Sequence, residues 1–544
     1  MEVAMSALGW SLSPSASGSR QYERKLGLNE LGFYYDSRFS GTADTLQNTL
    51  IETASSKLFG RERVQKAWVA IKQQFPLLGA SLKEVSKDQV YFVVDEISLG
   101  SCNLGDVVYR SCSSEEEVRE FVQVVVNGPR ILSNDRLACL FIIQRTDKPA
   151  YFHTVVHVAH CITDGMSNIS ILSTLLSYLS KGVPANEPSL ENQLGLSIAS
   201  ETLRSDLKGS LAKRRWHRAM GKVLLQIRNM KRTGGHTLPR TWTTKSMETP
   251  AQSALIADSF SVEQSQIVMA NCRKYGMTFG NAYPVIAQVA MTRVLCRRYL
   301  NGQMDKEEWE FRKRQPMMSA GPLNLRPYLD ERWYRDAGNA HVLLCIDFFT
   351  FVLPFMSLGP AANLVVGDAL PAFDALLSHN RFLLRCNIIK KQSADLFKNP
   401  RFLDLGLAYL PGRIERTRTS AIRWLEGADH HEEEKLSPQE QVKLGPVLGH
   451  GGSSMGNIDL LLPRDYPAGS GESQLHIHYS ATHLRCRPGE LYLGAATSRQ
   501  QLRLNIYWDL NVYDKALVEE WFFDVKDAVR HYLGRGTDIR DAKL

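Results

Sequence analysis

Two apolar runs that flank a short polar turn are the feature that most constrains the fold of this chain. Leu137 to Gln144 and Tyr151 to Ala159 are apolar and partly alternating, and Thr146-Asp147-Lys148-Pro149 between them has the composition of a turn. A third apolar segment, Met166 to Leu179, repeats instead at helical spacing. We therefore predict two paired strands that lead through a short loop into a helix.

The loop before this helix reads His160-Cys161-Ile162-Thr163-Asp164-Gly165. In a chain with 14 His, the pattern His-x-x-x-Asp-Gly is expected by chance only roughly 0.06 times at average Asp and Gly usage. A strand end can hold a side chain rigidly beside a cleft, and the imidazole pKa of about 6.5 suits proton transfer near neutral pH. We interpret His160 as a general base. The alternative is a structural histidine at a strand end.

Asp164 has two roles open to it. It could hydrogen-bond to the ring of His160, as in a hydrolytic triad, or it could brace the loop. Because an Asp just before a predicted helix is a favoured N-cap, its carboxylate would already accept backbone N–H groups. This position favours the bracing role.

Other kinds of active site fit the sequence less well. Gly452-Ser453-Ser454-Met455-Gly456 does not have the Gly-x-Ser-x-Gly spacing of a serine nucleophile, and Cys161 has the character of a small buried residue. His153 and His157 share a strand face, but His160 has the opposite parity and no further ligand completes a site. We therefore expect no metal.

Length and composition place the chain among ordinary globular proteins. The 544 residues exceed what one hydrophobic core normally organises, so we predict two domains. Apolar residues at 44% and charged residues at 22% exclude a disordered or fibrous chain. The net charge of +8 comes without basic motifs interleaved with aromatic residues, so we expect no nucleic-acid partner.

Cysteine usage and hydropathy indicate the compartment. The nine cysteines include no Cys-x-x-Cys pair. No apolar run reaches the ~18 residues of a membrane span, and the N-terminal stretch lacks the apolar core of a signal peptide. We expect a cytoplasmic monomer without a membrane partner.

A basic segment divides the chain. Thr202 to Arg232 carries ten Lys or Arg and one Asp, and Gly234-Gly235 follows it. We place an N-terminal domain at 1–205, a basic crossover linker at 206–255 and a C-terminal domain at 256–544. Two interpretations of the charge run stay open: a solvated helix face, or an attraction for the phosphates of a small cosubstrate.

Both predicted domains combine strands with flanking helices. In the second, Gln474 to Ser480 and Leu502 to Asp509 alternate in polarity like strands, and Lys515 to Leu533 has the pattern of an amphipathic helix. The sequence contains no short repeat. We predict a pseudo-duplicated pair of α/β domains.

The His160 motif resembles the His-x-x-x-Asp signature of the coenzyme A-dependent acyltransferase superfamily, which includes BAHD acyltransferases, chloramphenicol acetyltransferase and peptide-synthetase condensation domains. Ser453 to Asp459, with the overall length, is similar to fungal trichothecene 15-O-acetyltransferases. The Asp-Phe-Gly-Trp-Gly motif of plant BAHD enzymes is absent. Four further segments resemble the superfamily: Gln74-Phe75-Pro76-Leu77-Leu78-Gly79, Thr278-Phe279, Asn324-Leu325-Arg326 and Gly338-Asn339.

The resemblance implies a fold and roles for individual residues. The expected fold is a chloramphenicol acetyltransferase-like two-domain pseudo-dimer, in which each domain is a mixed β-sheet flanked by helices and an active-site tunnel lies between the domains. His160 would be the general base and Asp164 a structural residue paired with Arg326. Gly165 would keep the loop open beside the acyl carbonyl. The residues expected to contact substrate are Ser453, Ser454 and Asn324.

The implied reaction is transfer of an acetyl group from acetyl-CoA to a hydroxyl of a small-molecule alcohol, without a permanently bound cofactor. A backbone N–H near Gly165, or a hydroxyl of Ser453 or Ser454, would stabilise the oxyanion. One alternative is a condensation-type enzyme that takes its acyl group from a carrier protein. The other is a non-catalytic binding protein of the same fold.

Overall fold

The computed structural model describes residues 9–14, 18–186, 188–204, 210–427, 433–469 and 471–535. The strands are β1 (Trp10–Pro14), β2 (Arg20–Lys25), β3 (Thr45–Thr53), β4 (Ser81–Ser86), β5 (Gln89–Asp95), β6 (Val107–Cys112), β7 (Ala138–Arg145), β8 (Tyr151–Val158), β9 (Ser253–Ser259), β10 (Met317–Asn324), β11 (Ile346–Leu353), β12 (Leu448–Asn457), β13 (Asp465–Tyr466), β14 (Leu475–Leu484), β15 (Leu491–Ser498) and β16 (Gln501–Asp509).

The helices follow the same numbering along the chain. They are α2 (Leu28–Arg38), α3 (Arg61–Gln74), α4 (Glu96–Leu99), α5 (Glu115–Asn127), α6 (Gly165–Lys181), α7 (Leu190–Leu196), α8 (Leu211–Met230), α9 (Val262–Lys274), α10 (Phe279–Leu300), α11 (Lys306–Arg312), α12 (Glu331–Trp333), α13 (Phe373–Leu376), α14 (His379–Phe397), α15 (Phe402–Glu426), α16 (Pro438–Leu444) and α17 (Lys515–Leu533).

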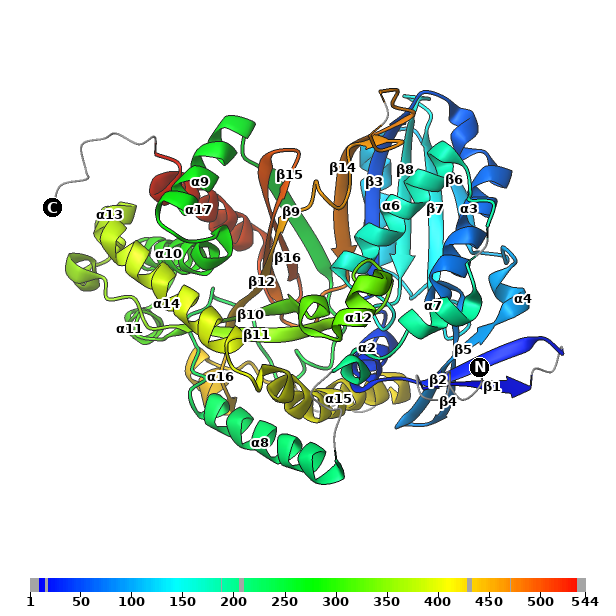
Figure 1. The fold of residues 1–544 in the computed structure, drawn as a ribbon. Coiled ribbons are helices and arrows are strands. Elements are labelled where there is room, and N and C mark those ends of the chain that lie inside the picture. Colours follow the sequence, from blue (N-terminus) through cyan, green and yellow to red (C-terminus); the bar gives the residue numbers. More distant parts are fainter. Residues whose placement is uncertain are drawn as a thin grey trace.

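The first domain is built on a six-stranded mixed sheet in the order β13-β14-β3-β8-β7-β6 (Figure 1). The predicted pair of strands is present as β7 and β8, which are antiparallel with Ala138 opposite Val158. Nearly every residue of both strands is buried, because their apolar side chains meet packed layers on both faces of the sheet. The strand β6 pairs parallel to β7 and makes the sheet mixed.

The second domain has its own six-stranded mixed sheet, in the order β11-β10-β12-β15-β16-β9. The helices α9, α10, α14 and α17 lie together beside this sheet (Figure 1). Their apolar faces form a second hydrophobic core, separate from the core of the first domain. The predicted α/β architecture of two domains with mixed sheets and flanking helices is therefore confirmed.

Two strands from late in the chain belong to the first sheet. The strand β14 pairs antiparallel with β3, with Leu475 opposite Thr53 and Leu484 opposite Thr45, and β13 extends the sheet beyond β14. Seven of the nine β3 residues are buried, so this strand needs a partner on each side. In the structure, the first domain thus combines residues before about 204 with residues 465–484. The division predicted from the sequence places residues 465–484 in the C-terminal domain.

The predicted crossover contains the exposed helix α8, and β9 begins before the crossover's expected end and forms an edge of the second sheet. A separate sheet of four strands, in the order β1-β2-β5-β4, lies near the N-terminus (Figure 1). In the described part of the chain, no helix combines the length and the apolar character needed to cross a bilayer.

Candidate active site

His160 lies in the turn that follows β8, where the first sheet ends. Its ring stacks on Phe33 of α2, with 4.2 Å between the ring centroids and 21° between the planes. Burial, and then the positive charge of Arg487, lower the pKa of His160 below 6.5, while Asp164 opposes the shift. The imidazole is therefore neutral, and able to accept a proton, at neutral pH.

Asp164 does not serve the ring of His160. It is the N-cap of α6, where its Oδ1 accepts a hydrogen bond from the backbone N–H of Ser167 at 2.9 Å. Its Oδ2 accepts from Arg326 Nη1 at 2.8 Å and from the backbone N–H of Cys345 at 2.9 Å. The carboxylate is engaged on both oxygens by groups that hold the loop, as the bracing role requires.

Arg326 joins three segments at the centre of the molecule. It follows β10, and its Nη2 donates to Ser167 Oγ at 2.9 Å and to the carbonyl oxygen of Leu343 at 3.1 Å. Asn324 Oδ1 accepts from the backbone N–H of Arg326 at 3.2 Å and from its Nη1 at 3.3 Å. Only 1% of the side chain of Arg326 and 2% of that of Asp164 are exposed, so the ion pair is fully buried.

The charges of this pair depend on each other. Burial alone would raise the pKa of Asp164, but the guanidinium of Arg326 and the two backbone N–H groups together hold that pKa below its ordinary value. Burial likewise opposes the charge of Arg326, and the carboxylate of Asp164 raises its pKa in compensation. Either charge without the other would be strongly destabilising at this position.

The Ser453 to Asp459 block reaches the His160 loop from the second sheet. Gly165 is exposed, and a Cβ built on it would lie 3.4 Å from Cε of Met455 in β12. Ser453 accepts a hydrogen bond from the hydroxyl of Tyr492 at 2.7 Å. Ser454 is exposed, and its Cβ would lie 3.6 Å from a Cβ built on Gly280. Of this block, Met455 is the residue that the structure brings onto the loop.

Phe33 stacks on His160, and Arg413 and Arg487 lie over Phe33, but none of the three carries a recognisable sequence signal. The guanidinium of Arg413 lies 4.1 Å from the centroid of the Phe33 ring, and that of Arg487 lies 5.4 Å from it. Asp36 Oδ2 accepts from Arg413 at 2.6 Å and from Arg487 at 2.9 Å. Both arginines lie hundreds of positions after α2 in the sequence, so only the tertiary fold brings them to Phe33.

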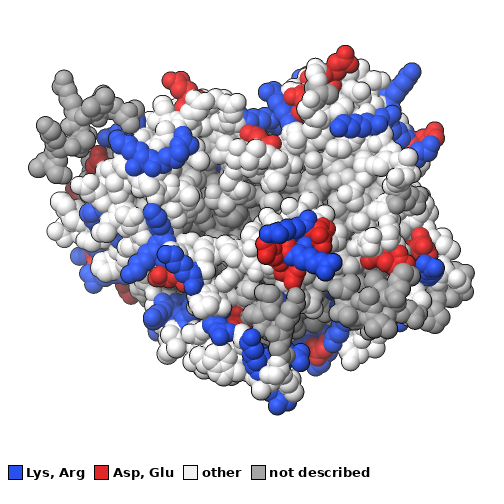
Figure 2. All heavy atoms as spheres, viewed as in Figure 1, with Lys and Arg blue, Asp and Glu red and all other residues white. Residues whose placement is uncertain are grey.

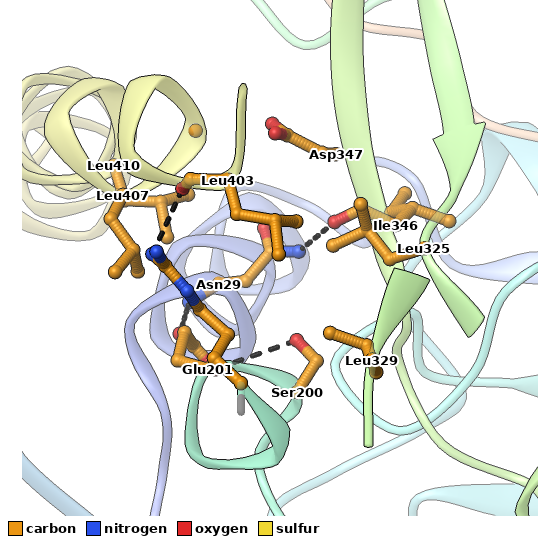
Figure 3. Close-up of a pocket in the computed structure, with 12 residues that line it drawn as sticks. Asn29, Ser200, Glu201, Leu325, Leu329, Ile346, Asp347, Leu403, Leu407 and Leu410 are labelled. Carbon is orange, nitrogen blue, oxygen red and sulfur yellow. Dashed lines mark hydrogen bonds between the residues drawn. The ribbon is translucent and has the colours of Figure 1, made fainter. Parts of the chain in front are cut away.

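A cavity lies beside the same helix α2 (Figure 3). Asn29, one turn before Phe33, donates its amide N–H to the carbonyl oxygen of Ile346 at 2.8 Å, and its Oδ1 has no partner among the described residues. Burial raises the pKa of Asp347 in the same cavity to about 6. The remaining residues that line the cavity are Ser200, Glu201, Arg204, Leu325, Leu329, Leu403, Gly406, Leu407 and Leu410.

The neighbouring candidates for other chemistry are engaged in the core. His153 Nδ1 lies 3.0 Å from Asn48 Oδ1, and its Nε2 lies 3.3 Å from a carboxylate oxygen of Glu115. Burial raises the pKa of the Cys161 thiol far above its usual range, so the nucleophilic thiolate is not formed at neutral pH. Burial lowers the pKa of His157 to about 4.

No protein-family model matches this chain, and no curated protein matches it in sequence. Solved structures do match in fold. The TRI3 trichothecene 15-O-acetyltransferase from Fusarium sporotrichioides is 13% identical, with a TM-score of 0.66 over 96% of this chain and 97% of that chain. The condensation domain of the Monacolin K polyketide synthase MokA is 10% identical, with a TM-score of 0.57 over 94% of this chain and 97% of that chain.

The first condensation domain of the calcium-dependent antibiotic synthetase, in complex with a substrate analogue, is 12% identical. Its TM-score is 0.55 over 96% of this chain and 99% of that chain. Because these matches span nearly the whole length of both chains, the likeness includes both domains and the way they are joined. At such low identity it concerns the fold alone. This chain has the two-domain α/β fold of these acetyltransferase and condensation-domain structures.

Proposed function

We propose that this protein is an O-acyltransferase that moves an acetyl group from acetyl-CoA to a hydroxyl of a fungal secondary metabolite. The proposed acceptor is a trichothecene-type sesquiterpenoid, at its 15-O position. The observation that carries the proposal is the neutral ring of His160 at a strand end, with Asp164 drawn away into a buried pair with Arg326. The fold shared with an acetyltransferase supports the same class of reaction.

His160 acts as the general base in a direct transfer. Its ring nitrogen takes the proton of the acceptor hydroxyl while the oxygen attacks the thioester carbonyl of acetyl-CoA. The tetrahedral intermediate then collapses, the C–S bond breaks, and the thiolate of CoA takes the proton from the imidazolium. The products are the acetate ester and CoA, and no covalent enzyme intermediate forms. The raised pKa of the Cys161 thiol is consistent with that absence.

We assign the oxyanion contact to the segments that meet beside His160. Gly165 is the proposed backbone donor, and its exposed, side-chain-free position supports an open loop there. Ser453 is the second candidate because it accepts from Tyr492 and so keeps its own hydroxyl proton to donate. Asn324, proposed earlier as a substrate contact, instead has its amide oxygen on Arg326. We therefore propose a positioning role for it.

The proposal is tested by incubating the protein with acetyl-CoA and a panel of sesquiterpenoid and polyketide alcohols, followed by mass spectrometry of the products. The wild type should add one acetyl group to a trichothecene-type alcohol. His160→Ala should lose at least ~100-fold in kcat while it keeps the wild-type melting temperature, because general-base catalysis typically contributes 10²–10⁴. Turnover by His160→Ala close to that of the wild type would exclude the general-base role.

A carrier-bound acyl donor is the second candidate, favoured by the likeness to condensation domains. The two donors are separated by comparing acetyl-CoA with an acetyl-loaded carrier protein at equal concentration. A strong preference for the loaded carrier would replace acetyl-CoA in the proposal. Saturable heat of acetyl-CoA binding without any acetylated product would instead identify a binding protein of this fold.

A further inference from the structure

The helix α8 carries charge of one sign only. Its twenty residues include no Asp or Glu, and its basic residues are Lys213, Arg214, Arg215, Arg218, Lys222 and Arg228. The helix lies on the outer side of α15, at the lower edge of the molecule in Figure 1, and Figure 2 shows separate Lys and Arg side chains among uncharged residues on this edge. A long helix with an uncompensated positive charge is thus presented to the outside of the fold.

The helix α8 packs against the rest of the molecule through one narrow face. His217 and Gly221, four residues apart, are the buried positions. A Cβ on Gly221 would lie 2.7 Å from the backbone oxygen of Asp404 in α15, so the two helices are in close contact there. His217 Nδ1 lies 3.1 Å from Oδ2 of the same Asp404. Most of the helix circumference therefore remains outside this contact.

An apolar stripe runs along the exposed part of α8. Trp216, Val223, Ile227 and Met230 are separated by seven, four and three residues, so they share one face of the helix. Their exposed fractions are 51%, 47%, 42% and 77%. The guanidinium of Arg401 covers one side of the Trp216 ring at 4.7 Å, and the rest of the ring faces outward. No described segment of the chain covers this stripe.

A basic face adjoins the apolar stripe. Arg215, Arg218 and Lys222 occupy a second exposed face at spacings of three and four residues. None of them has an ion-pair or hydrogen-bond partner among the described residues, whereas buried guanidinium groups such as those of Arg326 and Arg413 are paired with carboxylates. The exposed half of α8 is therefore amphipathic, with an apolar stripe beside free positive charge.

We infer that α8 docks the protein on the surface of an anionic phospholipid bilayer. The apolar stripe would enter the boundary between headgroups and acyl chains, where Trp216 is suited to the interface, and the basic face would contact the negative headgroups. A nucleic acid would use the basic face but leave the apolar stripe in water. A bilayer surface with anionic headgroups matches the chemistry of both faces at once.

This inference replaces the expectation of a protein without a membrane partner. That expectation rested on the lack of a spanning segment, and docking in the plane of the interface requires none. It does not depend on the proposed acetyl transfer, because α8 contains none of the residues assigned to that reaction.

The test is cosedimentation of the full-length protein with vesicles of phosphatidylcholine containing about 30% phosphatidylserine, in about 0.1 M salt. The wild type should sediment with these vesicles and stay in solution with vesicles of phosphatidylcholine alone. The combined variant Arg215→Glu, Lys222→Glu and Arg218→Glu should lose at least ~10-fold in apparent partitioning. Val223→Gln with Ile227→Gln should weaken binding by interrupting the apolar stripe while it retains every charge.

The matched control changes the same charge elsewhere on the surface. Lys57→Glu, Lys181→Glu and Lys398→Glu replace exposed lysines without ion-pair partners in the described structure, and this variant should bind like the wild type. Circular dichroism melting of each variant verifies that it is folded. Wild type that stays in solution, equal binding to neutral vesicles, or full binding by both α8 variants would overturn the inference. Wild type that stays in solution with the vesicles but binds single-stranded DNA would likewise overturn it in favour of nucleic acid.

Discussion

Two charged groups act on the proton affinity of His160 in opposite directions. Arg487 lowers the pKa of the imidazole and Asp164 raises it, but burial decides the net shift to a value below 6.5. Both oxygens of Asp164 accept hydrogen bonds from other groups, so its carboxylate acts on the ring through its charge and not as a hydrogen-bond partner. The site thus favours a neutral base over a charged ion pair.

This balance predicts the pH dependence of catalysis. A base with a lowered pKa stays deprotonated as the pH falls, so the acid limb of kcat/KM should lie below pH 6.5 in the wild type. Arg487→Gln removes a positive charge near the ring, so it should move the acid limb to higher pH. The measurement is a pH–rate profile of both proteins. An unmoved limb in a folded variant would show that Arg487 does not act on His160.

The Asp164–Arg326 pair predicts a large loss of stability. Asp164→Asn leaves the buried guanidinium of Arg326 without its counter-ion, at a cost of about 3–5 kcal/mol in the free energy of unfolding. Because the folded-state pKa of Asp164 is lowered from 3.8, its contribution is present above that pH and is lost as the pH falls through the lowered value. Urea denaturation at neutral and acidic pH measures both effects.

The control for this prediction is an exposed ion pair. Glu331→Gln breaks the pair with Arg335, whose side chains are 75% and 74% exposed, and should cost less than about 1 kcal/mol. Replacement of both buried partners, as Asp164→Ala with Arg326→Met, should recover part of the stability lost in Asp164→Asn. An Asp164→Asn variant as stable as the wild type, but inactive, would indicate a direct chemical role for the carboxylate.

Helices and strands with a clear local polarity pattern could be predicted from the sequence, but the pairing between strands could not. The β7–β8 pair, α6 and α17 lie where the polarity patterns place them, and α17 spans Lys515–Leu533 as predicted. The strand β14 was predicted from its alternation, yet nothing local indicates that it pairs with β3 of the other domain. Strand pairing over such separations depends on the complete sheet, so single-sequence periodicity does not contain it.

The residues of the candidate site likewise include some that the sequence indicates and others that only the fold reveals. The loop from His160 to Gly165 and the partner Arg326 carry residue types whose spacing or family likeness makes them visible in the sequence. Phe33 is an ordinary apolar helix residue by sequence, and it becomes part of the site only because α2 is packed against the end of β8. Phe33 could be recognised as a site residue only once its tertiary contact with His160 is known.

Asp347 of β11 has a buried carboxyl group, and we predict that its replacement by Asn stabilises the protein. Burial raises the pKa of Asp347 from 3.8 to about 6, so the folded chain retains a proton there that the unfolded chain releases. Stability is therefore lost as the pH rises between these values and remains lower above them. Asp347→Asn keeps the Oδ1 that accepts from the backbone N–H of Phe348 and removes the penalty. At pH 8 it should add on the order of 2 kcal/mol.

Melting temperatures of the wild type and Asp347→Asn at pH 4 and pH 8 test this prediction. The gain should be clear at pH 8 and small at pH 4, where the wild-type carboxyl is protonated in the folded protein. An equal gain at both pH values would mean that packing, rather than ionisation, is responsible.

For the whole molecule, the crossing of β13 and β14 into the first sheet predicts that the first domain cannot be isolated in sequence order. A fragment of residues 18–204 would expose the unpaired edge of β3 and should aggregate. The same fragment with residues 463–486 fused through a flexible linker should be monomeric and should melt cooperatively. Size-exclusion chromatography and calorimetry distinguish the two, and a soluble, cooperative short fragment would contradict the prediction.

The short link from β14 back to β15 also bears on how the molecule moves. Arg487, which tunes the basicity of His160, lies in this link and is anchored to Asp36 of α2. This link is one of the places where the chain passes between the two sheets, as it also does before β9 and between β12 and β13. A shift of the link would change the distance between the guanidinium of Arg487 and the imidazole of His160. The pKa of the proposed base is therefore sensitive to the joint between the domains.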